Sequence, residues 1–204
     1  GIVLECGENT CRCSIVFSGY VLEHPTTETS CAGRVITQRI VERIQQESPN
    51  LLPPIPENSS ESFVRYSRDA YIKQLKESPG LLPQFDINSF SKELLFPSTP
   101  EGENIGLDYM VMKTLMKCDY DVIMKTSKHL IIAGGTSLID GIGEKVTSTI
   151  HEFFPTLQTE YIKEESSVLQ KYSAWRGGAL IANSDSMKDV WVTKQEYEEN
   201  GVGI

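Results

Sequence analysis

Short apolar segments separated by turn-forming residues open the chain. Strands are predicted where apolar and β-branched residues are flanked by turn residues, over 1–5, 11–17, 20–22 and 130–133. Residues 7–10 and Ser18-Gly19 are the tight turns between the first three strands. The polar run 26–30 then leads into a helix.

Helical periodicity or helix-end signals occur in five places, at 36–44, 61–76, 107–119, 142–153 and 193–200. The second helix is expected to have its N-cap within 58–60 and the fourth to have Asp140 as its N-cap. Thr193 and Glu196 fit a capping box for the last helix. Residues 79–104 hold four prolines with little periodicity and are predicted to be a loop with short elements. Strands alternating with helices indicate the α/β class.

Composition narrows the class of protein. The 204 residues carry a formal net charge of −9, which argues against a basic nucleic-acid-binding surface. The hydrophobic fraction of 39% and the charged fraction of 23% are typical of a globular protein. No apolar run approaches the roughly 18 residues that a membrane span needs.

The cysteines and histidines give no sign of metal or nucleophilic chemistry. The five cysteines contain no Cys-x-x-Cys pair and have no histidine at metal-ligand spacing, so reduced core thiols are expected. His24, His129 and His151 lie far apart, with no nucleophile placed beside any of them in sequence. A Ser-His or Cys-His catalytic pair is therefore not indicated.

Two glycine turns are the candidate binding features. Residues 7–10 and 134–136 each follow a β-type segment, and glycine lets the main chain approach a phosphate or a sugar closely. Taken singly, the first is equally well explained as a plain hairpin and the second as a strand-to-helix turn. In an α/β fold ligands bind at strand ends, so the two turns together favour a nucleotide cleft.

Several segments resemble, in order, the C-terminal half of actin and the actin-related proteins: 1–8, 32–34, 116–121, 133–137, 171–178 and 191–197. Only the stretch from about 45 to 104 is poorly covered, and it looks shortened. The resemblance implies an α/β, actin-like (actin/Hsp70/sugar-kinase) ATPase fold, represented by its C-terminal lobe with part of the first lobe. Residues 1–173 would form the nucleotide-binding lobe, with the shortened insertion at about 45–104, and residues 174–204 would be C-terminal helices that pack on an N-terminal lobe.

The resemblance also implies a site for ATP or ADP with Mg²⁺. The first glycine turn would approach the phosphates, Arg68 and Asp69 would fall where a Lys-Glu pair contacts ribose and base, and Lys171 would close over the base. The nucleotide-binding residues implied in this way are Gly7, Glu8, Asn9, Thr10, Gly33, Arg68, Asp69, Gly134, Gly135, Thr136, Ser137 and Lys171. Glu5 and Glu8 would position the metal through water.

Three departures from the family pattern bear on activity. Glu5 and Glu8 stand where hydrolysing members carry Asp, and misplacing a carboxylate by about 1 Å can cost a hundredfold in rate. Ile139 replaces the aromatic side chain expected against adenine. We therefore expect weak or no ATPase activity and assign no catalytic residue. The acidic run 99–104 replaces an apolar filament-contact loop, which disfavours ordinary filaments.

The chain begins at Gly1, directly in a strand, and lacks the family's first phosphate loop, its metal-facing Asp and its water-orienting Gln. We therefore expect the retained half of a longer actin-related chain, or a partner that covers the gap. Without such a cover, four apolar side chains near the C-terminus are expected to lie exposed: Trp175, Leu180, Ile181 and Trp191.

The main functional hypothesis is a divergent actin-related subunit of a dynactin-like or chromatin-remodelling complex that binds nucleotide with little or no hydrolysis. Its partners would be other proteins, among them actin or actin-related proteins, with no nucleic acid or membrane. Its location would be intracellular, in the cytoplasm and cytoskeleton or the nucleus. The alternative is a polymerising actin-like ATPase whose N-terminal half is missing here. A small-molecule kinase of the same superfamily has less support, because no sugar site is visible.

Overall fold

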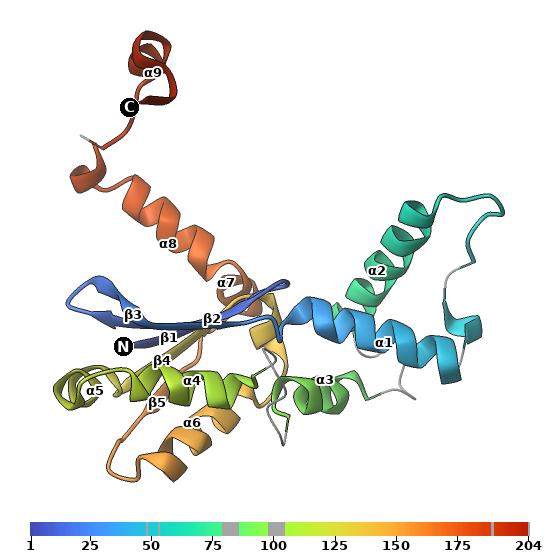
Figure 1. The fold of residues 1–204 in the computed structure, drawn as a ribbon, viewed down its shortest axis with the longest axis horizontal. Coiled ribbons are helices and arrows are strands. Elements are labelled where there is room, and N and C mark those ends of the chain that lie inside the picture. Colours follow the sequence, from blue (N-terminus) through green and yellow to red (C-terminus); the bar gives the residue numbers. More distant parts are fainter. Residues whose placement is uncertain (48, 53, 79–85, 98–104, 189, 204) are drawn as a thin grey trace.

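A mixed β-sheet forms the centre of the molecule (Figure 1). The structure is a computed structural model of residues 1–204 and describes all of them except 48, 53, 79–85, 98–104, 189 and 204. Within this described part, five strands lie in the order β3-β2-β1-β4-β5. Their bounds are β1 Ile2–Cys6, β2 Cys11–Phe17, β3 Tyr20–Thr29, β4 His129–Ala133 and β5 Glu160–Ile162.

Strand direction places both glycine turns at one edge of the sheet. β1 and β2 form an antiparallel hairpin closed at the Cys6–Cys11 pair, which confirms the expected tight turn. β1 and β4 run parallel, with Glu5 opposite Ala133, and β5 continues the parallel half. The carboxyl ends of β1 and β4 therefore lie side by side, which is where ligands bind in α/β sheets.

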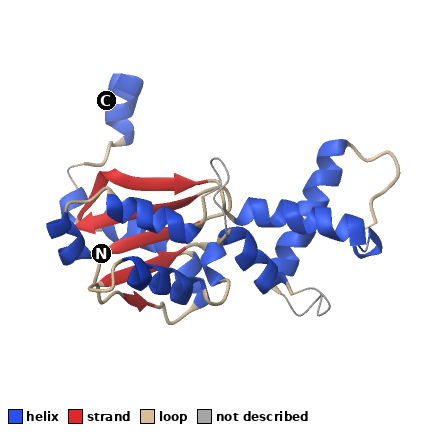
Figure 2. Cartoon of the chain, turned by 60° about the horizontal axis from the view of Figure 1, so that its bottom comes forward, coloured by secondary structure: helices blue, strands red, loops and turns tan. Residues whose placement is uncertain are grey.

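One face of the sheet is buried under three helices (Figures 1 and 2). These are α4 Leu107–Met116, α5 Tyr120–Thr126 and α6 Ile142–Phe153. Alternate residues of β1 point into this layer, so Leu4 is fully buried whereas its neighbour Val3 is only half-buried. The buried cluster continues through β2 and β4 to Leu115 of α4 and Val146 of α6.

β3 is longer than the sequence predicts, and its threonines explain the difference. We predict a strand of three residues with a polar run after it, but β3 extends for ten residues, to Thr29. Thr27 Oγ1 donates a hydrogen bond to the carbonyl oxygen of Met110 at 3.1 Å, and Thr29 Oγ1 donates to that of Ile105 at 3.0 Å. The hydroxyl groups of these threonines thus find hydrogen-bond acceptors in and just before α4, so they can be buried. Threonine is also β-branched, which favours a strand.

A group of helices extends from the strand ends that carry the glycine turns (Figure 2). It contains α1 Gly33–Glu47, α2 Glu61–Glu77 and α3 Ile87–Leu95, together with the short 3-10 helix η1 Pro49–Leu51. The predicted N-cap of α2 is confirmed, because Ser60 Oγ accepts a hydrogen bond from the Phe63 N–H at 3.3 Å. The buried residues of α2 are Ile72 and Leu75, both near its C-terminal end, so that end is the one packed against α1.

One predicted N-cap is wrong, and α3 Ile87–Leu95 and α5 lie outside the segments with predicted helical periodicity. α3 lies in the stretch predicted as loop with short elements, and its N-cap is Asp86, whose side chain accepts a hydrogen bond from the Ser89 N–H. α5 lies where no element was predicted. The N-cap of α6 is Gly141 with a left-handed backbone, and not Asp140, because the helix begins only at Ile142. The predicted acidic loop tip at 99–104 lies outside the described residues.

The C-terminal segment leads away from the sheet (Figure 1). After α7 Ser167–Lys171 it contains α8 Ser173–Ala182 and α9 Lys194–Asn200, with the 3-10 helices η4 Asp185–Met187 and η5 Gly201–Gly203. The expected capping box of Thr193 and Glu196 is present. The four apolar side chains expected to be exposed are exposed, from 56% for Trp191 to 75% for Trp175, with Leu180 and Ile181 between them. Among the described residues, no helix is long and apolar enough to cross a membrane.

The cysteines form a buried group along β1, β2 and the start of α1. Cys6, Cys11, Cys13 and Cys31 are buried, Cys118 is half-buried, and all five are free thiols. Burial raises the pKa of Cys13 to about 12 and that of Cys31 to about 11. The pKa of Cys6 is also raised, first by its hydrogen bond with Cys11 and then by burial.

Thiol labelling tests this burial. Because the thiolate is the reactive form and needs access to the reagent, iodoacetamide at pH 8 is expected to modify Cys118 first in the folded protein. Peptide mass spectrometry follows each site, and the same reagent in denaturant provides the control in which all five cysteines react. Labelling of Cys13 as fast as that of Cys118 under native conditions would contradict the burial described here.

Candidate functional site

The two glycine turns meet at the carboxyl ends of β1 and β4. Thr136 Oγ1 donates a hydrogen bond to the carbonyl oxygen of Gly7 at 2.8 Å, which ties the second turn to the first. The second turn continues as the 3-10 helix η3 Gly135–Leu138. α1 starts beside both turns, because the N–H groups of Gly33 and Arg34 donate to the carbonyl oxygens of Gly7 and Glu8.

Close packing at this junction explains two of the glycines. Gly134 has a φ of +94°, and a Cβ atom there would lie 2.4 Å from the carbonyl oxygen of Cys6. A Cβ atom on Gly33 would lie 2.7 Å from Glu8 Oε2 and 2.8 Å from Thr136 Oγ1. Only glycine fits either position without displacing a neighbour. At the junction of the two turns, neighbouring atoms therefore occupy the space that a side chain on Gly33 or Gly134 would need.

The N–H groups of both leading glycines are already used inside the protein. The Gly7 N–H donates to the Thr10 carbonyl oxygen at 3.1 Å, and the Gly134 N–H donates to that of Gln170 at 3.0 Å. These two N–H groups hold the turns in shape. Any ligand contact from the turns would therefore come from their other atoms.

The C-terminal end of α2 places a lysine against the first turn. Lys76 Nζ donates to the carbonyl oxygen of Gly33 at 2.9 Å and to Thr37 Oγ1 at 2.6 Å, and it lies 3.5 Å from Glu8 Oε2. Burial lowers the pKa of Lys76, and the neighbouring Glu8 carboxylate works in the opposite direction. Hydrogen bonds to two fixed acceptors offset part of the cost of burying this charge.

α7 places a second lysine at the other side. The side chain of Gln170 is buried and donates to the carbonyl oxygen and the Oγ of Ser137, so α7 is fastened to η3. The adjacent Lys171 then reaches Glu77 on α2, with 2.8 Å between Nζ and Oε1. This hydrogen bond lowers the pKa of Glu77 and raises that of Lys171, so both stay charged. The pair is exposed to solvent and contributes little to stability.

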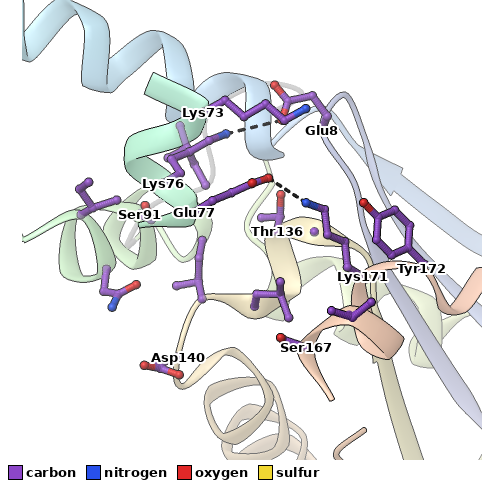
Figure 3. A pocket seen from close by; sticks show the side chains of 17 residues that line it. Glu8, Lys73, Lys76, Glu77, Ser91, Thr136, Asp140, Ser167, Lys171 and Tyr172 are labelled. Atoms are coloured by element: carbon purple, nitrogen blue, oxygen red, sulfur yellow. Dashed lines mark hydrogen bonds and ion pairs between the residues drawn. The ribbon is translucent and has the colours of Figure 1, made fainter. Parts of the chain in front are cut away.

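Together these elements enclose a pocket of about 640 Å³ (Figure 3). This volume lies within the range of about 300–1,000 Å³ that is usual for small-molecule and cofactor sites. Charged groups line it from the first turn, α2, the segment after η3, and α7: Glu8, Lys73, Lys76, Glu77, Asp140 and Lys171. Its apolar wall comes from α1, α3, the region of η3, and α7: Ile36, Ile87, Leu138, Ile139 and Val168.

The structure brings only part of the predicted site to the pocket. Glu8, Gly135, Thr136 and Lys171 line it. Four others do not line the pocket but take part in the hydrogen bonds within and between the turns: Gly7, Gly33, Gly134 and Ser137. Asn9 and Thr10 are exposed in the hairpin turn and are not among the lining residues.

The two residues predicted on α2 lie elsewhere. Arg68 lines a second pocket, of about 580 Å³, beside the 49–55 connection, and Asp69 is exposed outside both pockets. The lysines and the glutamate of α2 that line the main pocket stand near its C-terminal end, at Lys73, Lys76 and Glu77. The i, i+3 spacing of the two lysines is a sequence signal for a shared helix face that the resemblance alone did not pick out.

Two other lining residues are Ile139 and Tyr172. Ile139 lines the pocket, as expected from the resemblance. Tyr172, which the sequence reasoning missed, also lines it and stands 5.6 Å from Lys171 Nζ, measured to the ring centroid. An aromatic side chain is therefore present in the pocket, though it comes from α7's C-cap and not from the turn after β4.

The residues do not fit a divalent metal site. Magnesium favours carboxylate and other oxygen ligands. Glu8, however, faces the Lys76 ammonium, and Glu5 is exposed in β1 and is not a lining residue. Within the described part of the chain, no group of three or more His, Cys, Asp or Glu side chains is placed to hold a metal ion.

The fold and the site define an α/β protein with a pocket at the carboxyl ends of parallel strands, lined by lysines from two helices and by a set of apolar residues. A family model for actin matches residues 85–204, more than half of the chain, so the chain belongs to the actin family. Its mixed sheet flanked by helices agrees with an actin-like α/β fold. The match includes the second glycine turn and α7. It does not include the first turn or α2.

Proposed function

We propose that this actin-family chain binds an adenine nucleotide, ATP or ADP, in the pocket between the two glycine turns. The observation that carries the proposal is the joining of the turns by the Thr136–Gly7 hydrogen bond beneath lysines from α2 and α7. Lysine ammonium groups are suited to phosphate oxygens. The apolar wall and Tyr172 offer a surface for the base, which is a flat aromatic group.

The charges of the pocket support an anionic ligand of this kind. Glu8 and Glu77 are the ion-pair partners of Lys76 and Lys171. Both carboxylates are about half exposed, at 47% and 53%, so they can turn to solvent when phosphate oxygens take their place. The Lys171–Glu77 pair is exposed and worth at most about 1 kcal/mol, so exchanging it costs little. The Lys76–Glu8 pair is held at 3.5 Å, which is longer than a strong charge-assisted hydrogen bond.

We propose further that the nucleotide serves mainly to stabilise the fold, and that the chain is a structural subunit of a multi-protein complex of the dynactin-like or chromatin-remodelling type. The exposed apolar side chains of the C-terminal segment, Trp175 and Leu180 among them, support a contact with another protein. Identification of the companions of the native protein by mass spectrometry of the purified assembly tests the structural role.

Slow turnover is the kinetic prediction of this proposal. Glu8 faces Lys76 and Glu5 is exposed outside the pocket, so neither carboxylate is placed to order an attacking water, and a displacement of about 1 Å can already lower the rate about a hundredfold. Steady-state phosphate release is therefore expected to be about a hundredfold slower than that of conventional actin measured alongside. ATP binding is measured on the same sample, so that slow turnover is not confused with an empty site.

The outcome also separates this proposal from its alternative, a polymerising actin-like ATPase. Phosphate release at the rate of conventional actin, together with ATP-dependent pelleting, would establish the alternative. Bound nucleotide with slow release and no pelleting is the result that the proposal predicts.

A further inference from the structure

The ammonium group of Lys76 is fixed in place by groups of the chain itself. It donates to the carbonyl oxygen of Gly33 at 2.9 Å and to Thr37 Oγ1 at 2.6 Å. Its side chain is only 16% exposed, against 30% for that of Lys171. Because both acceptors belong to the first turn or two of α1, the position of this charge is set by the helix that begins beside the glycine turns. Such preorganisation lowers the cost of binding.

One donor of this ammonium group remains for a partner in the pocket. A lysine ammonium has three N–H donors, and two of them are used by Gly33 and Thr37. The third N–H is available to Glu8, whose Oε2 lies 3.5 Å from Lys76 Nζ. This distance is longer than the roughly 2.7–2.9 Å of a strong charge-assisted hydrogen bond. Glu8 is thus a loosely held partner that an anionic ligand can replace.

The same geometry disfavours a divalent cation beside the phosphates. Glu8 is the carboxylate that lines the pocket on the side of the first turn, and its counter-charge is already supplied from within the chain by Lys76. A metal ion drawn to Glu8 would stand close to the largely buried positive charge of Lys76, and like charges repel strongly where solvent is partly excluded. The remaining lining carboxylates, Glu77 and Asp140, come from α2 and from the segment after η3.

We propose that the Lys76 ammonium takes the place of a divalent metal ion in this site, so that the nucleotide binds through its phosphates without magnesium. The inference rests on the proposed nucleotide-binding function and adds to it the source of the positive charge. Lys76 is then a binding residue whose position is fixed by the carbonyl group of Gly33 and the hydroxyl group of Thr37.

Calorimetric titration of the full chain with ATP, once in magnesium and once in excess EDTA, tests the inference. The dissociation constants in the two buffers are expected to agree within about threefold, a difference of less than 1 kcal/mol. Lys76→Met is expected to weaken ATP binding about 10–100-fold in both buffers, the usual loss for a hydrogen bond to a charged group. Lys113→Met is the matched control, because it removes the same charge from an exposed position on α4 outside the pocket.

The possible results distinguish a failure of the magnesium-free binding mode from a failure of the proposed nucleotide-binding function. ATP binding by the unaltered chain that requires magnesium would overturn the inference and leave the nucleotide-binding function standing. Unchanged affinity in a folded Lys76→Met variant would also overturn it. Absence of ATP binding in both buffers would refute the proposed function, and the inference with it. Because the comparison of buffers uses the unaltered chain, it decides the question even where Lys76→Met fails to fold.

Discussion

Replacing Gly134 by alanine is expected to lower the free energy of unfolding by about 2–5 kcal/mol, the combined cost of a positive-φ, extended backbone that favours glycine and of overpacking. The new Cβ atom would lie 2.4 Å from the carbonyl oxygen of Cys6 and 2.8 Å from its carbonyl carbon. Both are backbone atoms of the central strand β1, so neither can swing aside as a side chain would. The second glycine turn must then move away from the first, and the pocket between them is expected to lose ATP binding.

Gly19 provides the matched control for this substitution. It has a similar φ of +86°, but a Cβ atom there would meet nothing within 4 Å. Gly19→Ala is therefore expected to cost only the backbone term, about 1–2 kcal/mol. Urea unfolding of both variants measures the difference. An equal loss of unfolding free energy in the two variants would show that the close approach of Gly134 to β1 adds nothing to the cost of the substitution.

The second large effect is expected at the centre of the sheet. Leu4 is fully buried, and it pairs with Cys13 on one side and Ile132 on the other. Leu4→Ala should lower the free energy of unfolding by about 2–5 kcal/mol, because the cavity cannot collapse between two paired strands. Natural domains are stable by only about 5–15 kcal/mol, so the loss is a large share of the total.

Val3 is the control for this core substitution. It is the next residue on the same strand, points to the other face of the sheet and is half-buried. Val3→Ala removes less buried surface and is expected to cost about 1 kcal/mol. Chemical denaturation followed by circular dichroism compares the two variants. If Val3→Ala were as costly as Leu4→Ala, the assignment of the buried face would be wrong.

β1, β2, β4 and most of the long helices could be predicted from the sequence because their signals are local, whereas the three-residue β5 was not predicted. β1 and β2 agree with their predicted segments to within a residue, and α1 and α2 contain theirs. β3 could not be predicted at its full length, because Thr27 and Thr29 are polar and only their hydrogen bonds to the segment around α4 explain their burial. Contacts between residues about eighty positions apart leave no local pattern.

The shorter helices were missed for different reasons. α5 is a seven-residue helix that buries only Ile123 and Thr126, so its periodicity is too brief to recognise. α3 does carry a usable signal. Ile87, Ser91 and Leu95 are buried at spacings of four, and Asp86 precedes them as an N-cap, but the surrounding prolines obscure the pattern.

The candidate site could be predicted where it depends on strand order and not where it depends on helix packing. The meeting of the two glycine turns follows from their positions after strands that prove to be parallel neighbours. Arg68 and Asp69, which the resemblance implied for the site, lie on α2 but do not line the main pocket. Only Ile72 and Leu75 of α2 are buried, so its C-terminal end is the one held at the pocket, and the lysines there become the lining residues.

Hydrogen–deuterium exchange with and without ATP tests the central claim, that the pocket between the glycine turns binds an adenine nucleotide. Slower exchange is predicted in the peptides that contain the first turn, the end of α2, η3 and α7, covering residues 7–10, 73–77, 135–140 and 167–172. Exchange that stays unchanged in these four segments, or that slows only around Arg68 and residues 49–55 at the second pocket, would contradict the claim.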